Sequence, residues 1–366
     1  MAFLVLLLTI MGKKINLSER LLLKESLNLN NFSHIILLLR RIFKYTIIFE
    51  LIGALFMSTQ FVPEYGISKW FFYSIFHSIS AFCNAGIDIL GDNSFVNYSN
   101  NAVMSITIMI LIIIGGLGFT VWTDIGNAMM KRLEHKLSYR KLIRELTLHT
   151  KLVIITTIIL LVTGTIFIFC FEYNNVTTMA NDSNGEKLLK SAFQSTTLRT
   201  AGFYTINQNE MTTVSKLISI CYMFVGGSPG STAGGIKNIT SLIILLLVIT
   251  YMKDKEKIHI FKKTIPESAV RRAIVVFAIS ILIVVIATMA LLLSETFLKE
   301  EILSSDLASF YTVSFMDVIY EVISAFATVG LTLGITSGLS ISGKIILIVL
   351  MIIGRLRTSN NINSFI

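Results

Sequence analysis

Three short stretches of the sequence share one pattern that ends near a glycine. They read SAFCNAGI at 80–87, TTLRTAGF at 196–203 and SAFATVGL at 324–331. Each has a hydroxyl residue six positions before its glycine, a small or β-branched residue just before it and a large apolar residue after it. The glycines, Gly86, Gly202 and Gly330, are 116 and 128 residues apart. The chain therefore contains one unit three times.

A loop of this kind can present backbone carbonyl oxygens to a cation. Carbonyl oxygens replace the hydration shell of an ion when the chain turns them toward a central path. Glycine reaches left-handed backbone angles without a Cβ clash, which gives one glycine per loop a mechanical reason. One apolar hairpin with a glycine turn would be weak evidence, but three copies in register favour a pore.

The composition indicates that these loops lie within a membrane. Of the 366 residues, 54% are hydrophobic and only 14% are charged, and the mean hydropathy is +0.74. Soluble domains carry roughly 25% charged residues. Cys83, Cys170 and Cys221 form no C-x-x-C pair, so neither a disulfide scaffold nor a zinc or iron–sulfur site is indicated. The histidines and carboxylates form no catalytic set, and we expect neither an enzyme nor a bound cofactor.

The positive charge is strongly clustered. Of the 31 Lys and Arg residues, 21 lie in segments 13–44, 131–151 and 253–272, with seven in each. Because cytoplasmic loops carry an excess of Lys and Arg, we expect these segments on the cytoplasmic side of a plasma membrane. The net charge of +9 then reflects topology rather than nucleic-acid binding. A basic surface that attracts acidic lipid headgroups is a compatible interpretation.

Between the basic segments, apolar stretches occur in pairs. About 20 apolar residues are needed to cross a bilayer, and the candidates are 42–61 and 102–123, 152–171 and 214–251, and 273–298 and 341–355. Each pair encloses a shorter, semi-polar stretch that cannot span, namely 70–87, 188–203 and 315–331. The sequence thus predicts an all-α membrane protein of pseudo-symmetric repeats, each with a transmembrane helix, a re-entrant pore helix with a filter loop, and a second transmembrane helix.

We expect four units from this pattern. Residues 1–34 would be the tail of a first unit's exit helix plus a cytoplasmic loop, and 35–150 the second unit. Residues 151–272 would be the third unit, whose exit helix is broken, and 273–366 the fourth unit.

A glycine-rich stretch interrupts the long segment 212–251. As one helix its 40 residues would run about 60 Å, twice the hydrocarbon thickness. Five Gly and one Pro would cost a continuous helix roughly 8 kcal/mol. The stretch consists of Gly226, Gly227, Ser228, Pro229, Gly230, Ser231, Thr232, Ala233, Gly234 and Gly235. Unwound backbone at membrane depth is expected to line a water-filled path. A phosphate-binding loop is disfavoured because Ile236 stands where its lysine should, and a kink that only eases packing is the plainer alternative.

These features resemble the Trk/Ktr/HKT superfamily of potassium transporters, most nearly the bacterial KtrB-type membrane subunit. The resemblance covers nearly the whole chain. FHSISAFCNAG at 76–86 resembles the second filter loop of that family, FQSTTLRTAGF at 193–203 the third, and SAFATVGL at 324–331 the fourth. The resemblance implies four units round one pore and potassium uptake driven by the membrane potential, with sodium coupling.

The resemblance also assigns roles to residues by position. The filter residues it implies are Cys83, Asn84, Ala85, Gly86, Arg199, Thr200, Ala201, Gly202, Ala327, Thr328, Val329 and Gly330. Potassium would bind only transiently, at the carbonyls of these residues. The stretch 226–235 matches the intramembrane gating loop beneath the filter. Arg355 matches the final-helix arginine that faces this loop, with snorkelling near a helix end as the alternative.

Other charges at membrane depth are candidates for function by default. For Glu50, Asp88 and Glu321 we favour a structural role over cation attraction. Arg199 is expected to brace the filter backbone, because a guanidinium in the conduction path would repel cations.

By resemblance, the protein would form a homodimer in the lipid bilayer on a cytosolic, nucleotide-binding regulatory ring, which the basic loops could contact. The sequence departs from the family in two places. A first filter loop is missing, and the residues after Arg355 differ from the usual apolar continuation. We therefore expect an incomplete fragment that does not transport ions alone. The glycines in the other loops favour potassium over sodium by resemblance. The rival hypotheses are a secondary transporter of another substrate and a non-conducting structural membrane subunit.

Overall fold

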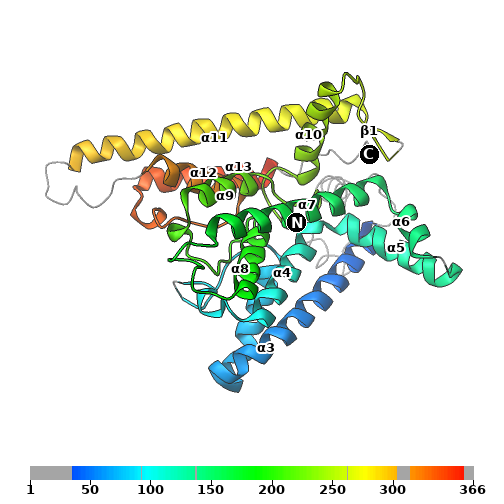
Figure 1. Ribbon diagram of the computed structural model, residues 1–366, viewed down its shortest axis with the longest axis horizontal. Coiled ribbons are helices and arrows are strands. Elements are labelled where there is room, and N and C mark those ends of the chain that lie inside the picture. Colours follow the sequence, from blue (N-terminus) through cyan, green and yellow to red (C-terminus); the bar gives the residue numbers. More distant parts are fainter. Residues whose placement is uncertain (1–34, 92, 137, 262, 303–313, 358–366) are drawn as a thin grey trace.

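The structure, a computed structural model, describes residues 35–91, 93–136, 138–261, 263–302 and 314–357 (Figure 1). The expectations for 1–34 and for 358–366 lie outside these residues. The described chain is helical except for loops and a two-stranded antiparallel hairpin of β1 His259–Ile260 and β2 Lys263–Thr264. The expected all-α class is confirmed.

One arrangement of helices recurs three times along the described chain. A long helix is followed by a shorter helix, a loop and a third helix. The first occurrence comprises α3 Ile35–Phe82, η1 Val96–Tyr98 and α4 Ala102–Leu117. The second comprises α7 Leu148–Glu172, α8 Asn184–Thr197, η2 Gln208–Glu210, α9 Thr213–Phe224 and α10 Asn238–Met252. The third comprises α11 Glu267–Ile302, α12 Phe315–Ala327, η3 Thr336–Gly338 and α13 Ile341–Arg357.

In the first occurrence the long and the short helix run into each other. Gly66 has φ 72° and ψ 170°, which are not helical angles, and it divides α3 into two helices, with Pro63 just before the kink. A left-handed angle costs glycine little. The second half of α3 is therefore the shorter helix, and it ends at Phe82.

Three described helices are long and apolar enough to cross a bilayer, over Leu39–Gly66, Leu148–Glu172 and Glu267–Glu295. A fourth candidate is the bent pair α4 and α5 Phe119–His135. Large apolar side chains are exposed along these helices and along α13, among them Leu51, Leu55, Ile158, Val285 and Ile348. A soluble monomeric protein rarely exposes so much contiguous apolar surface. The chain is a multi-pass membrane protein.

The predicted span 102–123 is wrong at its C-terminal end. Helix α4 stops at Leu117, and α5 leaves it at 93°. Gly118 makes the turn with φ 92°, and the carbonyl oxygen of Pro229 would lie 2.7 Å from a Cβ at this position. The turn was not predicted, because apolar residues continue on both sides of Gly118. Beyond α5, α6 Tyr139–Glu145 leads to α7.

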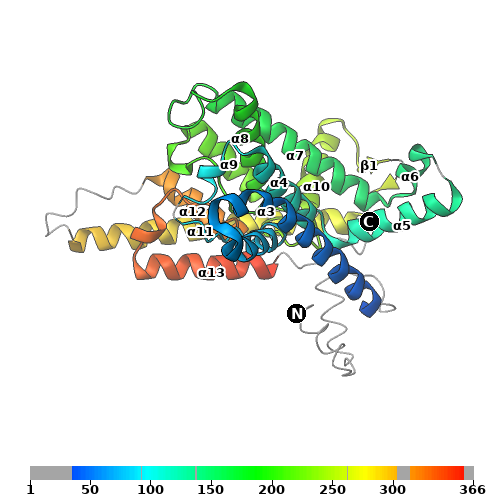
Figure 2. The same cartoon turned by 90° about the horizontal axis from the view of Figure 1, so that it is seen from below.

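The last three helices pack together, because α12 contacts both α11 and α13. Figures 1 and 2 show α12 and α13 beside the far half of α11, whose other end lies near α10, and they show α5 and α6 at the opposite end of the molecule. Aromatic contacts connect the recurring arrangements to one another: the rings of Phe95 and Phe203 lie 5.2 Å apart, and those of Phe224 and Phe326 lie 6.0 Å apart. The loops that follow the short helices are thereby drawn toward one centre.

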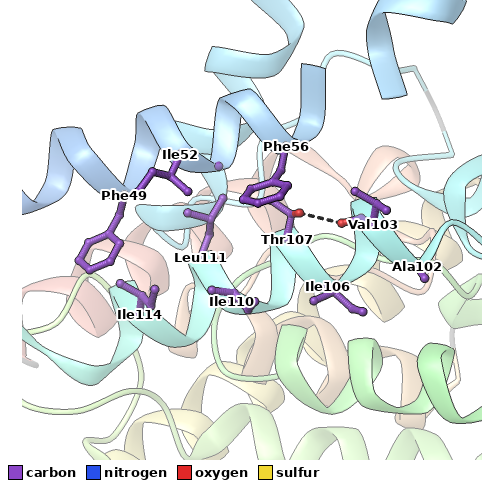
Figure 3. Close-up of a pocket in the computed structure, with 11 residues that line it drawn as sticks. Phe49, Ile52, Phe56, Ala102, Val103, Ile106, Thr107, Ile110, Leu111 and Ile114 are labelled. Carbon is purple, nitrogen blue, oxygen red and sulfur yellow. Dashed lines mark hydrogen bonds between the residues drawn. The ribbon is translucent and has the colours of Figure 1, made fainter. Parts of the chain in front are cut away.

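An apolar pocket of about 350 Å³ lies between α3 and α4 (Figure 3). Phe49, Phe56 and Ile110 are among the residues that line it. The hydroxyl of Thr107, which also lines it, donates its hydrogen to the carbonyl oxygen of Val103 at 2.7 Å. The apolar side chains of this pocket offer a bare cation too few ligands, so the polar path must be sought elsewhere.

Candidate functional site

The short helices begin with strong start signals. Ser183 and Glu186 form a capping box at α8, and Ser314 and Asp317 form one at α12. The backbone N–H of Ser183 donates to Glu186 at 2.8 Å, and the side-chain and backbone hydrogen bonds from Ser183 lower the pKa of the Glu186 carboxyl. Such reciprocal bonds satisfy otherwise unpaired donors at a helix start.

The second half of α3, α8 and α12 end at Phe82, Thr197 and Ala327, at the start of the three loops or just before it. The carboxyl end of a helix carries about half a negative charge. Three such ends face the segments 83–86, 199–202 and 327–330, which creates a potential that favours a cation there.

The three loops share one backbone conformation that the sequence pattern did not reveal. Each glycine has a positive φ, 64° at Gly86, 94° at Gly202 and 93° at Gly330. The residue two positions earlier is also left-handed in every loop, as listed by its φ: Asn84 49°, Thr200 68° and Thr328 53°. A β-branched residue in this region is an outlier, and such strain costs about 1–3 kcal/mol and concentrates at functional sites.

The glycines of the three loops meet in space although they are more than 100 positions apart in the sequence. A Cβ on Gly86 would overlap the carbonyl oxygen of Ala201 and lie 2.7 Å from the Cα of Gly202. A Cβ on Gly202 would overlap the carbonyl oxygen of Val329 and lie 3.0 Å from the Cα of Gly86. The Cα of Gly202 would lie 3.8 Å from a Cβ on Gly330. Three backbones therefore converge at one point.

In two of the three loops a hydroxyl group bridges the start and the end of the loop. The Ser80 hydroxyl donates to the carbonyl oxygen of Ile87 at 2.7 Å and accepts from its N–H at 3.0 Å. In the second loop of this kind, Thr197 donates to the carbonyl oxygen of Phe203. Alignment on the glycine would have assigned this role to Thr196, but the Thr196 hydroxyl bonds within its own helix.

The buried Arg199 contacts its neighbours through its backbone. Its carbonyl oxygen accepts from Asn84 Nδ2 at 3.4 Å. The guanidinium Nε and Nη2 have no hydrogen-bond partner among the described residues. The expected bracing role of the Arg199 side chain stays a prediction, while its main chain contacts Asn84.

Polar side chains connect the pore helices; the sequence pointed to Glu321, for which a structural role was favoured, but not to Gln194, Gln208 or Tyr320. Gln194 of α8 and Gln208 exchange hydrogen bonds of 2.7 and 3.1 Å. The Tyr320 hydroxyl of α12 donates to Gln208 at 2.9 Å. On the same helix, the buried Glu321 accepts from Thr332, from the N–H of Leu333 and from Thr336. No spacing in the sequence indicates these long-range pairs.

The expected interruption of the segment 214–251 is confirmed, because α9 ends at Phe224 and α10 begins at Asn238. The N–H of Gly226 donates to the carbonyl oxygen of Ile236 at 2.8 Å, which brings the two ends of the glycine-rich stretch together. We call residues 226–235 the glycine-rich loop.

The glycine-rich loop is bonded to the end of α4. Because α4 stops at Leu117, its last carbonyls lack partners within the helix. Ser228 supplies two donors to the carbonyl oxygen of Gly116, its N–H at 3.0 Å and its hydroxyl at 2.7 Å. The N–H of Thr232 donates to Gly115 at 3.3 Å. The sharp bend at Gly118 therefore leaves carbonyl oxygens at the end of α4 free to bind the glycine-rich loop.

The glycine-rich loop contacts all three converging loops. Thr232 donates its hydroxyl to Asn84 Oδ1 at 3.0 Å. The N–H of Gly234 donates to Thr200 Oγ1 at 3.0 Å. A Cβ on Gly234 would overlap Thr328 Oγ1 and lie 2.5 Å from the carbonyl oxygen of Ala327. The stretch thus lies against the point where the three backbones meet.

Two cationic side chains contact the glycine-rich loop. Arg355 Nη1 donates to the carbonyl oxygen of Thr232 at 2.8 Å. Lys237, which is 9% exposed, donates to the carbonyl oxygen of Ala233 at 2.8 Å. The sequence pointed to Arg355 but not to Lys237, because a lysine at the end of a glycine-rich stretch reads as a surface residue. Of the other predicted filter residues, Cys83 packs against the apolar cluster that contains Phe82, Ala201 and Phe203.

Comparison with known proteins agrees with this geometry. The model of the TrkH family, described as cation transport protein, matches residues 1–366. The potassium/sodium uptake protein NtpJ of Enterococcus hirae is 38% identical over 351 residues, which are 96% of this chain and 72% of that protein. The Ktr system potassium uptake protein B of Bacillus subtilis is 36% identical over 365 residues, 100% of this chain and 76% of that protein.

A solved structure shares the fold. The potassium transporter TrkH of Vibrio parahaemolyticus matches with a TM-score of 0.69 at 18% identity, over 93% of this chain and 66% of that one. Three converging glycine loops, a broken helix seated beneath them and the family match over the full length lead to one conclusion. The chain belongs to the TrkH family of cation transport proteins.

Proposed function

We propose that the chain is the membrane subunit of a potassium uptake system. The convergence of Gly86, Gly202 and Gly330 carries this proposal. The carbonyl oxygens of Ala201 and Val329 lie next to Gly86 and Gly202 of the neighbouring loops, and a ring of carbonyl oxygens is what a dehydrated cation needs. The relatives from Enterococcus hirae and Bacillus subtilis are named as potassium/sodium and potassium uptake proteins, which supports potassium as the ion.

In this proposal the segments 83–86, 199–202 and 327–330 are filter strands. Residues 35–150, 151–272 and 273–366 are then the second, third and fourth units. The glycine-rich loop is the gate beneath the filter, because unwound backbone at membrane depth is tolerated only where it lines a cavity or is buried in protein. Arg355 and Lys237 add positive charge at this gate and oppose the passage of cations while the loop is seated.

The wider setting belongs to the same proposal. The name of the Bacillus subtilis relative describes a Ktr system, so we infer that this subunit works with other components. These are a second copy of the chain and a cytosolic, nucleotide-binding ring beneath the basic loops. The subunit lies in the plasma membrane, and uptake is driven by the membrane potential with sodium coupling.

Growth of potassium-uptake-deficient cells at low potassium tests the proposal. The cells should be rescued by the chain itself or by a version extended with the parts of the Bacillus subtilis relative that lie outside the matched region. If neither version rescues growth despite expression in the membrane, the transport function is wrong. Accumulation of an organic substrate instead would favour a secondary transporter of another kind.

Removal of the gate is the second test. Deletion of 228–234 should raise the passive potassium leak in a transporting version, since the loop would no longer cover the filter. An unchanged leak would exclude a gating role, while rescue of growth would still support transport.

A further inference from the structure

We propose that His77, Gln194 and Glu321 are equivalent positioning residues that set how well the filter discriminates between cations of different size. Each lies on a pore helix and binds the segment that leaves its filter loop, and we call these three residues the anchors. The inference rests on the filter assignment in the proposed function. It goes beyond that assignment because the anchors act on ion selectivity through the backbone and are not themselves ion ligands.

The anchors occupy one register that the repeated pattern did not reveal. Each anchor lies three positions before the hydroxyl residue of its loop, in the pairs His77 and Ser80, Gln194 and Thr197, and Glu321 and Ser324. Counting from the glycines obscures this register, because the distance from anchor to glycine is nine residues in the first and third loops but eight in the second. Residues three apart lie on the same face of a helix, so each anchor lies one turn before its hydroxyl residue.

The first anchor is a histidine whose tautomer follows from its neighbours. His77 Nδ1 lies 2.7 Å from the carbonyl oxygen of Tyr73. A carbonyl oxygen can only accept, so Nδ1 carries the proton. The other ring nitrogen, Nε2, accepts from the N–H of Ile89 at 3.3 Å. Because Ile89 comes three positions after Gly86, this anchor ties the pore helix to the chain just beyond the filter.

The other two anchors make the same connection with different chemistry. Gln194 and Gln208 exchange amide hydrogen bonds of 2.7 and 3.1 Å. Glu321 accepts from the N–H of Leu333 at 3.0 Å, and Leu333, like Ile89, comes three positions after its glycine. An imidazole, an amide and a carboxylate thus perform one task, since each accepts a hydrogen bond from the segment that leaves the filter.

Burial makes these hydrogen bonds strong constraints. His77 and Gln194 are 0% exposed, and Glu321 is 4% exposed. A buried polar side chain is tolerated when it is hydrogen-bonded and costly when it is not. Movement of the outgoing segment away from an anchor would leave both partners unpaired. The anchors therefore resist displacement of the chain on the outer side of each filter glycine.

A filter strand bonded in this way is held at both ends. The strand 83–86 begins directly after α3. Beyond it, Ser80 bonds Ile87 and His77 bonds Ile89, so the chain returns along its own pore helix. A strand that is fixed at both ends resists the inward movement that a smaller ion would need to replace its hydration shell. Sodium is smaller than potassium, so we expect the anchors to favour potassium.

Hydrogen bonds also connect the outgoing segments of neighbouring units. The Tyr320 hydroxyl, next to Glu321 on α12, donates to Gln208 Oε1 at 2.9 Å. The N–H of Phe95, after the first filter loop, donates to the carbonyl oxygen of Tyr204, after the second, at 3.1 Å. The anchors thus belong to one connected frame, and loosening a single anchor should affect the width of the whole filter.

Ion binding tests the inference, measured by isothermal titration calorimetry in lipid nanodiscs on the chain and on the extended version. The measured quantity is the sodium Kd divided by the potassium Kd. Gln194→Met removes both amide hydrogen bonds from a side chain of nearly the same length. We expect this ratio to fall about 2- to 12-fold, the factor for the loss of one ordinary hydrogen bond. Gln60→Met is the matched control, because Thr59 and Asn101, the partners of Gln60, lie outside the filter loops. It should leave the ratio unchanged.

Variants of the other anchors separate the hydrogen bond from the packing. Glu321→Gln keeps an oxygen for the N–H of Leu333 and should retain the ratio, whereas Glu321→Met removes both acceptors and should lower it. His77→Phe keeps a ring but offers no acceptor to Ile89, so it should also lower the ratio. In His77→Phe the amide of Ile89 should exchange with deuterium about 2- to 12-fold faster.

Three results would overturn the inference. The first is a ratio that stays unchanged in Gln194→Met and His77→Phe, even if both variants unfold at a lower temperature, because a merely structural role changes stability without changing discrimination. The second is an equal fall of the ratio in Gln60→Met. The third is the absence of ion binding by both the chain and the extended version.

The two proposals can fail separately. If growth rescue fails but the ratio falls in the anchor variants, the anchors stand and the transport function falls. If growth is rescued but no anchor variant changes the ratio, the transport function stands and the role of the anchors falls.

Discussion

Replacement of Gly86 by alanine tests how closely the three loops approach one another. Gly86 has φ 64°, and its new Cβ would overlap the carbonyl oxygen of Ala201 and lie 2.7 Å from the Cα of Gly202. An ordinary contact begins at 3.4 Å, so the two strands must separate by more than about 0.7 Å, because the carbonyl oxygen lies closer still than the Cα. The displaced carbonyl is itself one of the proposed ion ligands.

The free-energy cost of Gly86→Ala has two contributions. The left-handed backbone costs an L-residue about 1–2 kcal/mol, and overpacking costs about 1–3 kcal/mol. Gly330→Ala is the matched control: its φ is 93°, but its Cβ would lie 3.8 Å from the Cα of Gly202, an ordinary contact. Only the first contribution applies there. The intact filter geometry should therefore be rarer in Gly86→Ala than in Gly330→Ala by about 5- to 140-fold, since 1.4 kcal/mol corresponds to a factor of ten.

The assay is uptake of radioactive rubidium into proteoliposomes by a transporting version of the chain, with sodium as competitor. Gly86→Ala should transport less and discriminate less against sodium than Gly330→Ala. Gly91→Ala, with φ 111° and nothing within 4 Å of its Cβ, should retain transport. Equal losses in the two filter variants would refute the reasoning, because they would mean that the loops are not in contact at Gly86.

Two further predictions concern residues around the filter. Arg355→Gln removes a charged hydrogen bond to Thr232, worth about 1.5–3 kcal/mol, so the potassium leak should rise on the order of tenfold. Lys344→Gln, on the same helix and bonded to Ser337, should leave the leak unchanged, and a leak equal in both variants would contradict a role for Arg355 at the gate. Glu321→Ala leaves the donors of Thr332, Leu333 and Thr336 without their acceptor, so thermal unfolding in detergent should show a loss of about 3 kcal/mol. The exposed Glu267, paired with Arg271, should cost less than about 1 kcal/mol when replaced by alanine, and a similar cost at both sites would exclude a special role for Glu321.

Much of the arrangement could be predicted from the sequence because it depends on local chemistry. The long apolar stretches, the repeated glycine and the broken segment 214–251 each follow from residue types over short windows. Five glycines and one proline would cost a continuous helix roughly 8 kcal/mol, so separate helices α9 and α10 were to be expected. The bend at Gly118 was missed because apolar residues continue on both sides of it.

Only the tertiary structure decided which atoms face one another. The convergence of Gly86, Gly202 and Gly330 depends on helices that pack from distant parts of the chain, and no single loop contains that information. The same holds for Asn84, Thr200 and Thr328, whose left-handed backbone puts their side chains against the glycine-rich loop. The sequence alone determined that each loop would need a glycine, because the backbone turn demands one. The fold determined what the neighbouring polar oxygens do, because their partners lie on other helices.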